Sequence, residues 1–153
     1  MIYEKVIGNI QTTDISKLYS EILFIDWHDI GRKLIRGVSS LNNEIGIKLE
    51  TGINAGDILY KDQEKVIYVD VSPCELTRAY VSNITEMGRL CFELGNRHLS
   101  LSIHDTYVDV PYDTPTFDYL LHKGFMVEKI NDKFTDFTIC HGHDGANDHH
   151  HHH

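Results

Sequence analysis

The sequence has few prolines, few cysteines and no long apolar stretch. Among its 153 residues are 3 prolines and 3 cysteines, and no run approaches the roughly 20 apolar residues of a membrane-spanning helix. The cysteines at positions 74, 91 and 140 fit no zinc-binding spacing, and so small and odd a number favours a reducing compartment without disulfides. The first residues also lack the features of a signal peptide. We therefore expect a cytoplasmic protein that does not enter a membrane.

Basic residues are scarce relative to acidic ones. The chain has 14 Lys and Arg against 23 Asp and Glu, a net charge of -9 with histidine neutral. A surface of that sign repels phosphates, so we expect no binding to nucleic acid. The same charge is compatible with attracting cations, although solubility alone accounts for it.

Motifs of common catalytic sites are also missing. The sequence contains no G-x-S-x-G, no phosphate-binding P-loop and no H-E-x-x-H. An enzyme is therefore unsupported, and we expect a protein that is not one.

Short segments that alternate apolar and polar residues fill the first part of the chain. Such alternation is typical of strands with one solvent-facing side. The expected strands cover residues 2–7, 22–25, 34–38, 45–49, 58–60 and 66–69. Many short strands with turns between them predict a β-rich domain, a small sandwich or barrel, over residues 1–71. Ser72-Pro73 marks the expected boundary, because proline removes a backbone donor and restricts its predecessor.

Residues 72–136 have a different pattern. Asn83 and Glu86 can form the capping box of a helix over 84–94 that ends at Gly95, and Cys91 falls on its apolar side. Thr114 as N-cap followed by Pro115 as the first helical residue predicts the start of a second helix. The expected strands cover residues 75–81, 99–103, 107–112 and 125–130. The order strand, helix, strand, strand, helix, strand predicts a ferredoxin-like domain.

From about residue 137 onward the apolar pattern stops, which predicts a flexible tail over residues 137–153. This tail is rich in histidine, the commonest metal ligand and one that suits nickel, zinc and copper. The five terminal histidines are also typical of a purification tag, so the sequence leaves a native tail and a tag both open. Cys140, His141 and His143 lie outside that run.

A further histidine, His98, follows the expected helix end in the stretch Gly95-Asn96-Arg97-His98. It can cap the carbonyls of its helix. Alternatively, near the two-fold axis of a homodimer it meets its own copy, and two imidazoles then share one ion. We predict the second arrangement, completed by the tail, and expect His104 and His122 to be surface residues. The predicted metal ligands are His98, His141, His143, His149, His150, His151, His152 and His153.

Three stretches together resemble the urease accessory protein UreE family. They are residues 1–9, the turn Gly56-Asp57-Ile58-Leu59 and, most specifically, Leu94-Gly95-Asn96-Arg97-His98. The histidine-rich end is similar to the family's variable tail, so the resemblance covers essentially the whole chain.

This resemblance implies a nickel metallochaperone that delivers nickel for assembly of the urease active site. It further implies an N-terminal domain of peptide-binding character and a ferredoxin-like metal-binding domain through which the protein forms a homodimer. The residue matching His98 would bind nickel at the dimer axis with help from tail histidines. The implied partners are the urease GTPase chaperone and apo-urease.

One departure from the family pattern lies just before the second helix. Many members carry a histidine pair there, whereas this chain has Tyr112-Asp113-Thr114-Pro115, so the peripheral sites of those members are not expected. Two other functions stay open. The chain can be a nickel or zinc store, or a peptide-binding module whose terminal histidines are only a tag.

Overall fold

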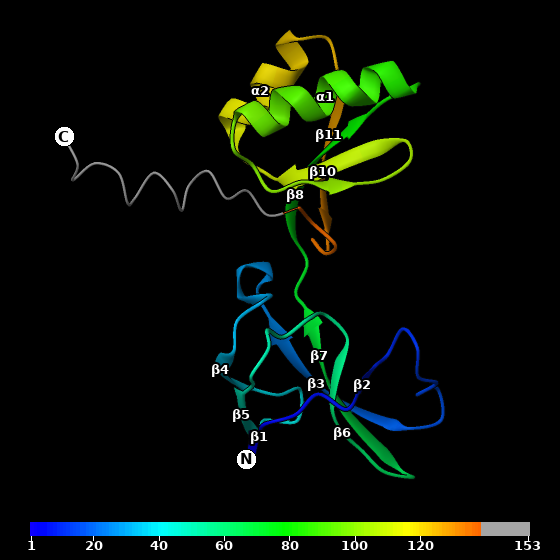
Figure 1. Ribbon diagram of the computed structural model, residues 1–153, viewed down its shortest axis with the longest axis vertical. Helices are drawn as coiled ribbons and strands as arrows, with labels where there is room; N and C mark the ends of the chain where they lie inside the picture. Colours follow the sequence, from blue (N-terminus) through cyan, green and yellow to red (C-terminus); the bar gives the residue numbers. More distant parts are fainter. Residues whose placement is uncertain (139–153) are drawn as a thin grey trace, which may run out of the picture. The chain divides into compact units, whose positions relative to one another are not determined.

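The computed structural model describes residues 1–138, which belong to two compact units, Met1–Ser72 and the part of the chain that follows (Figure 1). The division falls after Ser72, one residue beyond the end that the sequence predicts for the first domain. Among the described residues, no helix is both long enough and apolar enough to cross a membrane.

The first unit is built from short strands in two sheets. Its elements are β1 (Ile2–Tyr3), β2 (Gly8–Asn9), β3 (Tyr19–Ile25), the 3-10 turn η1 (Trp27–Asp29), β4 (Leu34–Val38), β5 (Glu44–Lys48), β6 (Asp57–Lys61) and β7 (Lys65–Val71). One sheet has the order β1-β5-β4 and the other β2-β6-β7-β3. The prediction of a β-rich first domain is therefore confirmed.

Apolar side chains from both sheets share one core. β3 and β7 pair in parallel, and buried residues alternate with less buried ones along β3 and from Ile67 onward in β7, because successive side chains point to opposite faces. The buried members of the core are Leu23, Ile25, Ile45, Ile47, Leu49, Ile53, Leu59, Ile67, Val69 and Val71. The predicted strand over residues 2–7 is shorter than expected, since only Ile2 and Tyr3 pair with β5.

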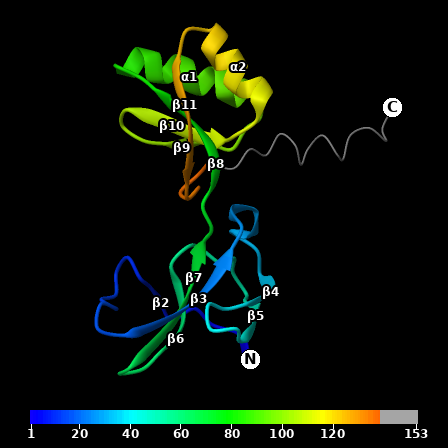
Figure 2. The same ribbon diagram turned by 180° about the vertical axis from the view of Figure 1, so that it is seen from behind.

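The second unit combines one sheet with two helices. Its elements are β8 (Cys74–Tyr80), α1 (Ile84–Asn96), β9 (Ser102–Ile103), β10 (Tyr107–Pro111), α2 (Thr114–His122) and β11 (Met126–Asp132). The sheet has the order β11-β8-β10-β9, and both helices lie on one side of it (Figures 1 and 2). The predicted order of strands and helices is confirmed, and the second domain is an α+β unit.

The core of this unit lies between the helices and the sheet. Its buried members are Ala79, Val81, Leu90, Leu94, Leu101, Val108, Val110, Leu120 and Phe125. Cys91 is half-buried and packs against this cluster, as the sequence predicts.

The start of α2 differs from the prediction. The sequence predicts Thr114 as the N-cap, and this is wrong. The Oδ1 atom of Asp113 accepts a hydrogen bond from the backbone N–H of Thr116 at 2.8 Å, so Asp113 is the cap and Thr114 is already helical. An aspartate carboxylate is at least as good a cap as a threonine hydroxyl, and Pro115 still lies in the first turn.

The described chain keeps its contacts as far as Thr138, beyond the predicted start of the tail at residue 137. Phe134 is fully buried, and its ring stacks on Phe137 with centroids 4.7 Å apart. Thr138 then forms an antiparallel bridge with Leu101. The prediction placed residues 137 and 138 in the tail because an isolated aromatic residue carries no periodic pattern.

Candidate functional site

The helix that leads to His98 begins with a well-formed cap. The Oδ1 atom of Asn83 accepts a hydrogen bond from the backbone N–H of Glu86 at 2.8 Å, as the sequence predicts. The Glu86 carboxylate reaches back and accepts from the backbone N–H of Ser82 at 3.0 Å, one residue earlier than in the usual capping box. These bonds satisfy donors that a helix N-terminus otherwise leaves unpaired.

α1 ends in a Schellman motif whose left-handed residue is His98. The helix continues through Gly95 to Asn96, with Arg97 as C-cap, and His98 has a φ angle of 57°. The backbone N–H of His98 donates to the carbonyl of Gly95 at 3.0 Å, and that of Leu99 donates to Leu94 at 3.5 Å. Both bonds belong to that motif. The prediction that Gly95 ends the helix is therefore wrong.

Glycine is the usual residue at this position because it lacks a Cβ atom. A left-handed backbone costs other residues about 1–2 kcal/mol, although histidine is among those that adopt it more often. Conformations of this kind persist where the surrounding structure imposes them, and they are frequent at functional sites. An exposed histidine in this conformation is therefore a candidate functional residue.

The residues on either side of His98 are anchored. Leu99 packs against the core of the second unit, and Arg97 contacts α2 through its side chain. The carbonyls of Leu94 and Gly95 accept backbone N–H groups within the turn, so these two carbonyls do not need an imidazole cap. The turn therefore presents the imidazole to solvent from a fixed backbone.

The last described residue, Thr138, lies beside Leu101. Thr138 and Leu101 exchange backbone hydrogen bonds of 2.6 and 3.3 Å, and Leu101 is three residues from His98. The predicted tail ligands His141, His143, His149, His150, His151, His152 and His153, and Cys140 with them, lie outside the described residues.

Of the predicted ligands, only His98 belongs to the described residues. Within residues 1–138, no group of three or more His, Cys, Asp or Glu side chains is placed to hold a metal ion. His104 lies on the surface, where its Nε2 atom is 3.1 Å from Ser102 Oγ and its ring stacks on Tyr107. His122 is exposed in the last turn of α2, and both histidines are surface residues as predicted. A metal site at His98 would thus need ligands from a second copy or from beyond residue 138.

Cys91 is poorly suited to metal binding. Burial raises the pKa of its thiol above the ordinary value, and a metal ligand must be a thiolate. Its Sγ atom lies 3.8 Å from the Met87 sulfur on the same helix. Packing rather than coordination therefore explains this residue.

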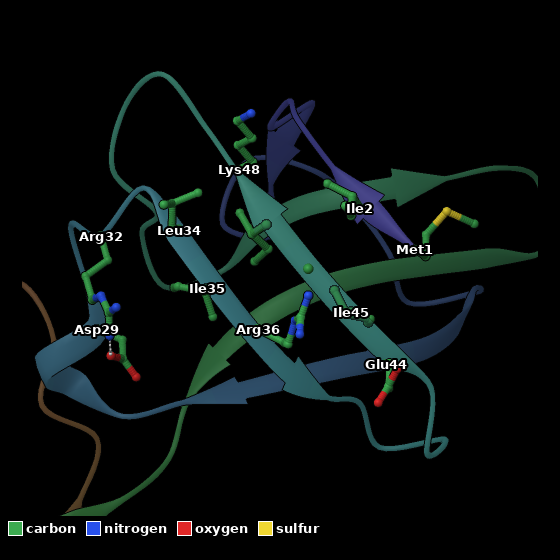
Figure 3. Close-up of a pocket in the computed structure, with 12 residues that line it drawn as sticks. Met1, Ile2, Asp29, Arg32, Leu34, Ile35, Arg36, Glu44, Ile45 and Lys48 are labelled. Carbon is green, nitrogen blue, oxygen red and sulfur yellow. Dashed lines mark hydrogen bonds and ion pairs between the residues drawn. The ribbon is translucent and has the colours of Figure 1, made fainter.

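A second candidate site is a hollow of about 680 Å³ on the outer face of β1, β4 and β5 (Figure 3). Gly46 lies between Ile2 and Arg36 in the cross-strand register. Because glycine has no side chain, the surface is recessed at this position. Leu34 and Val38 point outward from β4 and are exposed. The alternating pattern of residues 34–38 places both side chains on one face of the strand. This pattern could have indicated the apolar face, but the sequence analysis did not predict it.

Charged side chains surround the hollow. Arg32, Arg36 and Lys48 line it together with the acidic residues Asp29 and Glu44. Arg32 and Asp29 form an ion pair of 3.0 Å (Figure 3). The lining is therefore slightly basic, whereas the whole chain carries a net charge of -9.

Comparison with known proteins accounts for both units. Residues 3–72 match the model of the UreE urease accessory protein N-terminal domain, and residues 73–153 match that of its C-terminal domain. Urease accessory protein UreE of Bifidobacterium longum subsp. infantis is 38% identical over 148 residues, which cover 95% of this chain and 66% of that protein.

Two further relatives carry the same name. The protein of Acetivibrio thermocellus is 34% identical over 88% of this chain and 90% of its own length. That of Staphylococcus saprophyticus is 34% identical over 94% of this chain and all of its own length. The chain therefore belongs to the UreE family of urease accessory proteins, which are not enzymes and which act in the maturation of urease.

Proposed function

We propose that the chain is a nickel metallochaperone, which binds nickel at His98 and delivers it for assembly of the urease active site. The observation that carries this proposal is the exposed His98 in a left-handed turn at the end of α1. Membership of the urease accessory family supports the choice of nickel, which is the cargo here, with zinc and copper as ions that can replace it in vitro.

One imidazole binds an ion weakly, so the site needs further ligands. In this proposal two copies of the chain form a homodimer through their second units, which we assign to the ferredoxin-like fold. His98 of each copy lies near the two-fold axis, and the two share one nickel ion. His141, His143 and the terminal histidines assist this site and supply weaker additional sites. The nearness of Thr138 to Leu101 supports their participation.

Delivery requires partners that accept the ion. We assign this role to the urease GTPase chaperone and, through it, to apo-urease, in the cytoplasm. A protein that only stores nickel would need no such partner, so transfer distinguishes the two functions.

Nickel titration by calorimetry tests the site. We expect the chain ending at Thr138 to bind about one tight ion per dimer. His98→Ala in the same background should lose it, because the imidazoles that both copies contribute to the ion are removed. His104→Ala is the matched control, since it removes another exposed histidine of the same unit. Tight binding that survives His98→Ala would refute the assignment.

A transfer experiment tests the function. Nickel-loaded full-length chain is mixed with apo-urease and its GTPase chaperone, and urease activity is followed. We expect activation that the His98→Ala chain does not support. Equal activation by both chains would instead favour storage in the tail.

A second candidate function is peptide binding at the hollow of the first unit. The exposed Ile2 and Leu34 of the lining, together with its slightly basic charge, favour an extended segment that is apolar and acidic. Fluorescence polarisation with such a peptide should show binding that Leu34→Asp abolishes. Ile7→Asp serves as control, because Ile7 is an exposed apolar residue of this unit outside the hollow. Equal affinity of the two variants would exclude this site.

A further inference from the structure

Arg97 precedes His98 in the stretch that ends α1, and its positive charge is unfavourable there if His98 holds a divalent cation. Like charges near a protein surface repel each other. A positively charged residue next to the proposed metal ligand therefore needs an explanation other than binding the ion. The contacts of its side chain provide that explanation.

The Arg97 side chain is turned onto α2. Its guanidinium carbon lies 4.8 Å from the centroid of the Tyr119 ring, and its Nε atom lies 3.4 Å from the hydroxyl of Thr116, a buried residue. A guanidinium over an aromatic face is attracted to the ring electrons, and its planar shape suits stacking better than an ammonium does. These contacts draw the C-cap of α1 towards α2.

Tyr119 is attached to α1 at a second point. Its hydroxyl donates a hydrogen bond to the Glu93 carboxylate at 2.9 Å. Glu93 and Arg97 are four residues apart and therefore lie on the same side of α1. The half-buried Tyr119 therefore contacts the end of α1 twice, through its ring with Arg97 and through its hydroxyl with Glu93.

We propose that Arg97 and Tyr119 are positioning residues for His98, which they hold in its left-handed conformation for metal binding. This inference rests on the proposed nickel site. Leu99 fixes the backbone on one side of His98 through the core, and the Arg97–Tyr119 contact fixes it on the other.

The physical reason is the cost of the left-handed turn. A non-glycine residue leaves this conformation readily when its neighbours do not impose it. Without the Arg97 contact, the last turn of α1 frays and the imidazole samples several positions. An incoming ion must then order the imidazole, and that entropy is subtracted from the binding free energy.

Four variants of the chain ending at Thr138 separate positioning from charge. Arg97→Ala removes both the charge and the stacking plane, whereas Arg97→Lys keeps the charge alone. Tyr119→Leu removes the ring, and Tyr119→Phe keeps it. Lys123→Ala is the matched control, because Lys123 also lies over the Tyr119 ring, at 5.6 Å, but is distant in sequence from His98.

We expect Arg97→Ala, Arg97→Lys and Tyr119→Leu to weaken nickel binding by about tenfold, the lower end of what changes around a ligand produce. Lys123→Ala should bind like the parent chain, and Tyr119→Phe, which keeps the ring but loses the bond to Glu93, should weaken binding less than Tyr119→Leu does. In the metal-free protein, the same three variants should show faster exchange of the His98 and Leu99 backbone amides. That measurement is made without nickel and needs no active urease.

Three results would overturn the inference. One is unchanged nickel affinity in both Arg97 variants. Another is a nickel affinity that rises in Arg97→Ala but equals that of the parent chain in Arg97→Lys. Such a result would mean that the charge of Arg97 repels the ion. The third is unchanged amide exchange. If His98→Ala itself keeps the tight ion, it is the nickel site that fails, so the two proposals are separable.

Discussion

At the residue scale, the backbone of His98 opposes stability and favours function. Replacing it with glycine removes a left-handed cost of about 1–2 kcal/mol, partly offset by the greater freedom of glycine in the unfolded chain. We expect His98→Gly to raise the free energy of unfolding of the metal-free protein by up to about 1 kcal/mol in chemical denaturation, while the tight nickel ion is lost. His104→Gly is the control and should destabilise. If the His98→Gly chain is no more stable than the His98→Ala chain, the left-handed backbone at position 98 does not cost stability.

A second residue of interest is Glu21, which is almost fully buried in the first unit. Burial by itself raises the pKa of this carboxyl group. Hydrogen bonds from Lys65, Ser39 and Asn43 outweigh that effect and hold the pKa at about 2. Lys65 Nζ lies 2.8 Å from the carboxylate, and Ser39 donates its hydroxyl to the other oxygen.

The lowered pKa of Glu21 predicts a specific dependence of stability on pH. Because the folded pKa lies below the ordinary value, the contribution is present above about pH 4.5 and is lost as the pH falls towards 2. Glu21→Gln should lower the free energy of unfolding by about 1–3 kcal/mol at pH 7. The difference from the parent chain should shrink in urea denaturation at decreasing pH. A difference that stays constant between pH 7 and pH 2.5 would refute the pKa assignment.

At the scale of elements, the start of α2 offers a test of its cap. Asp113→Ala removes the hydrogen bond to the Thr116 N–H and should destabilise the second unit by about 1 kcal/mol. Thr114→Ala is the matched control one residue along, and it should cost much less because Thr114 is already helical. Thermal unfolding of both variants provides the measurement. The reverse order of their effects would restore Thr114 as the cap.

At the scale of the whole molecule, the end of the chain divides into a structural and a binding part. Ending the chain at Thr138 keeps the buried Phe134 and the bridge to Leu101, so the second unit should unfold at its original temperature. Ending it at Asp132 removes a buried phenylalanine, and its loss should cost about 3 kcal/mol or more. Differential scanning calorimetry compares the two. Equal stability would mean that residues 133–138 contribute nothing to the fold.

The same truncation should lower nickel capacity. The chain that ends at Thr138 lacks seven histidines of the proposed tail, so equilibrium dialysis should find fewer weak sites while the tight site persists. Unchanged capacity would assign the weak sites to residues 1–138.

The sequence by itself determined the features that depend on neighbours along the chain. Alternation placed most strands of the first unit, and the helical period with the Asn83 cap placed α1. Proline at position 73 indicated the division between units. Each depends on residues a few positions apart, because strand period, helix period and caps are local. His98 was selected in the same way, from its place after a helix.

Tertiary structure decided what depends on residues far apart. The left-handed turn at His98 instead of Gly95 accompanies the packing of Leu99 on the core. The contact of Arg97 with Tyr119, the bridge between Leu101 and Thr138, and the hollow at Gly46 join segments that no local pattern connects. A left-handed histidine is unfavourable in isolation, and long-range contacts help the local hydrogen bonds of the turn to compensate its cost. Local preferences therefore located the candidate ligand, whereas long-range packing determined how it is presented.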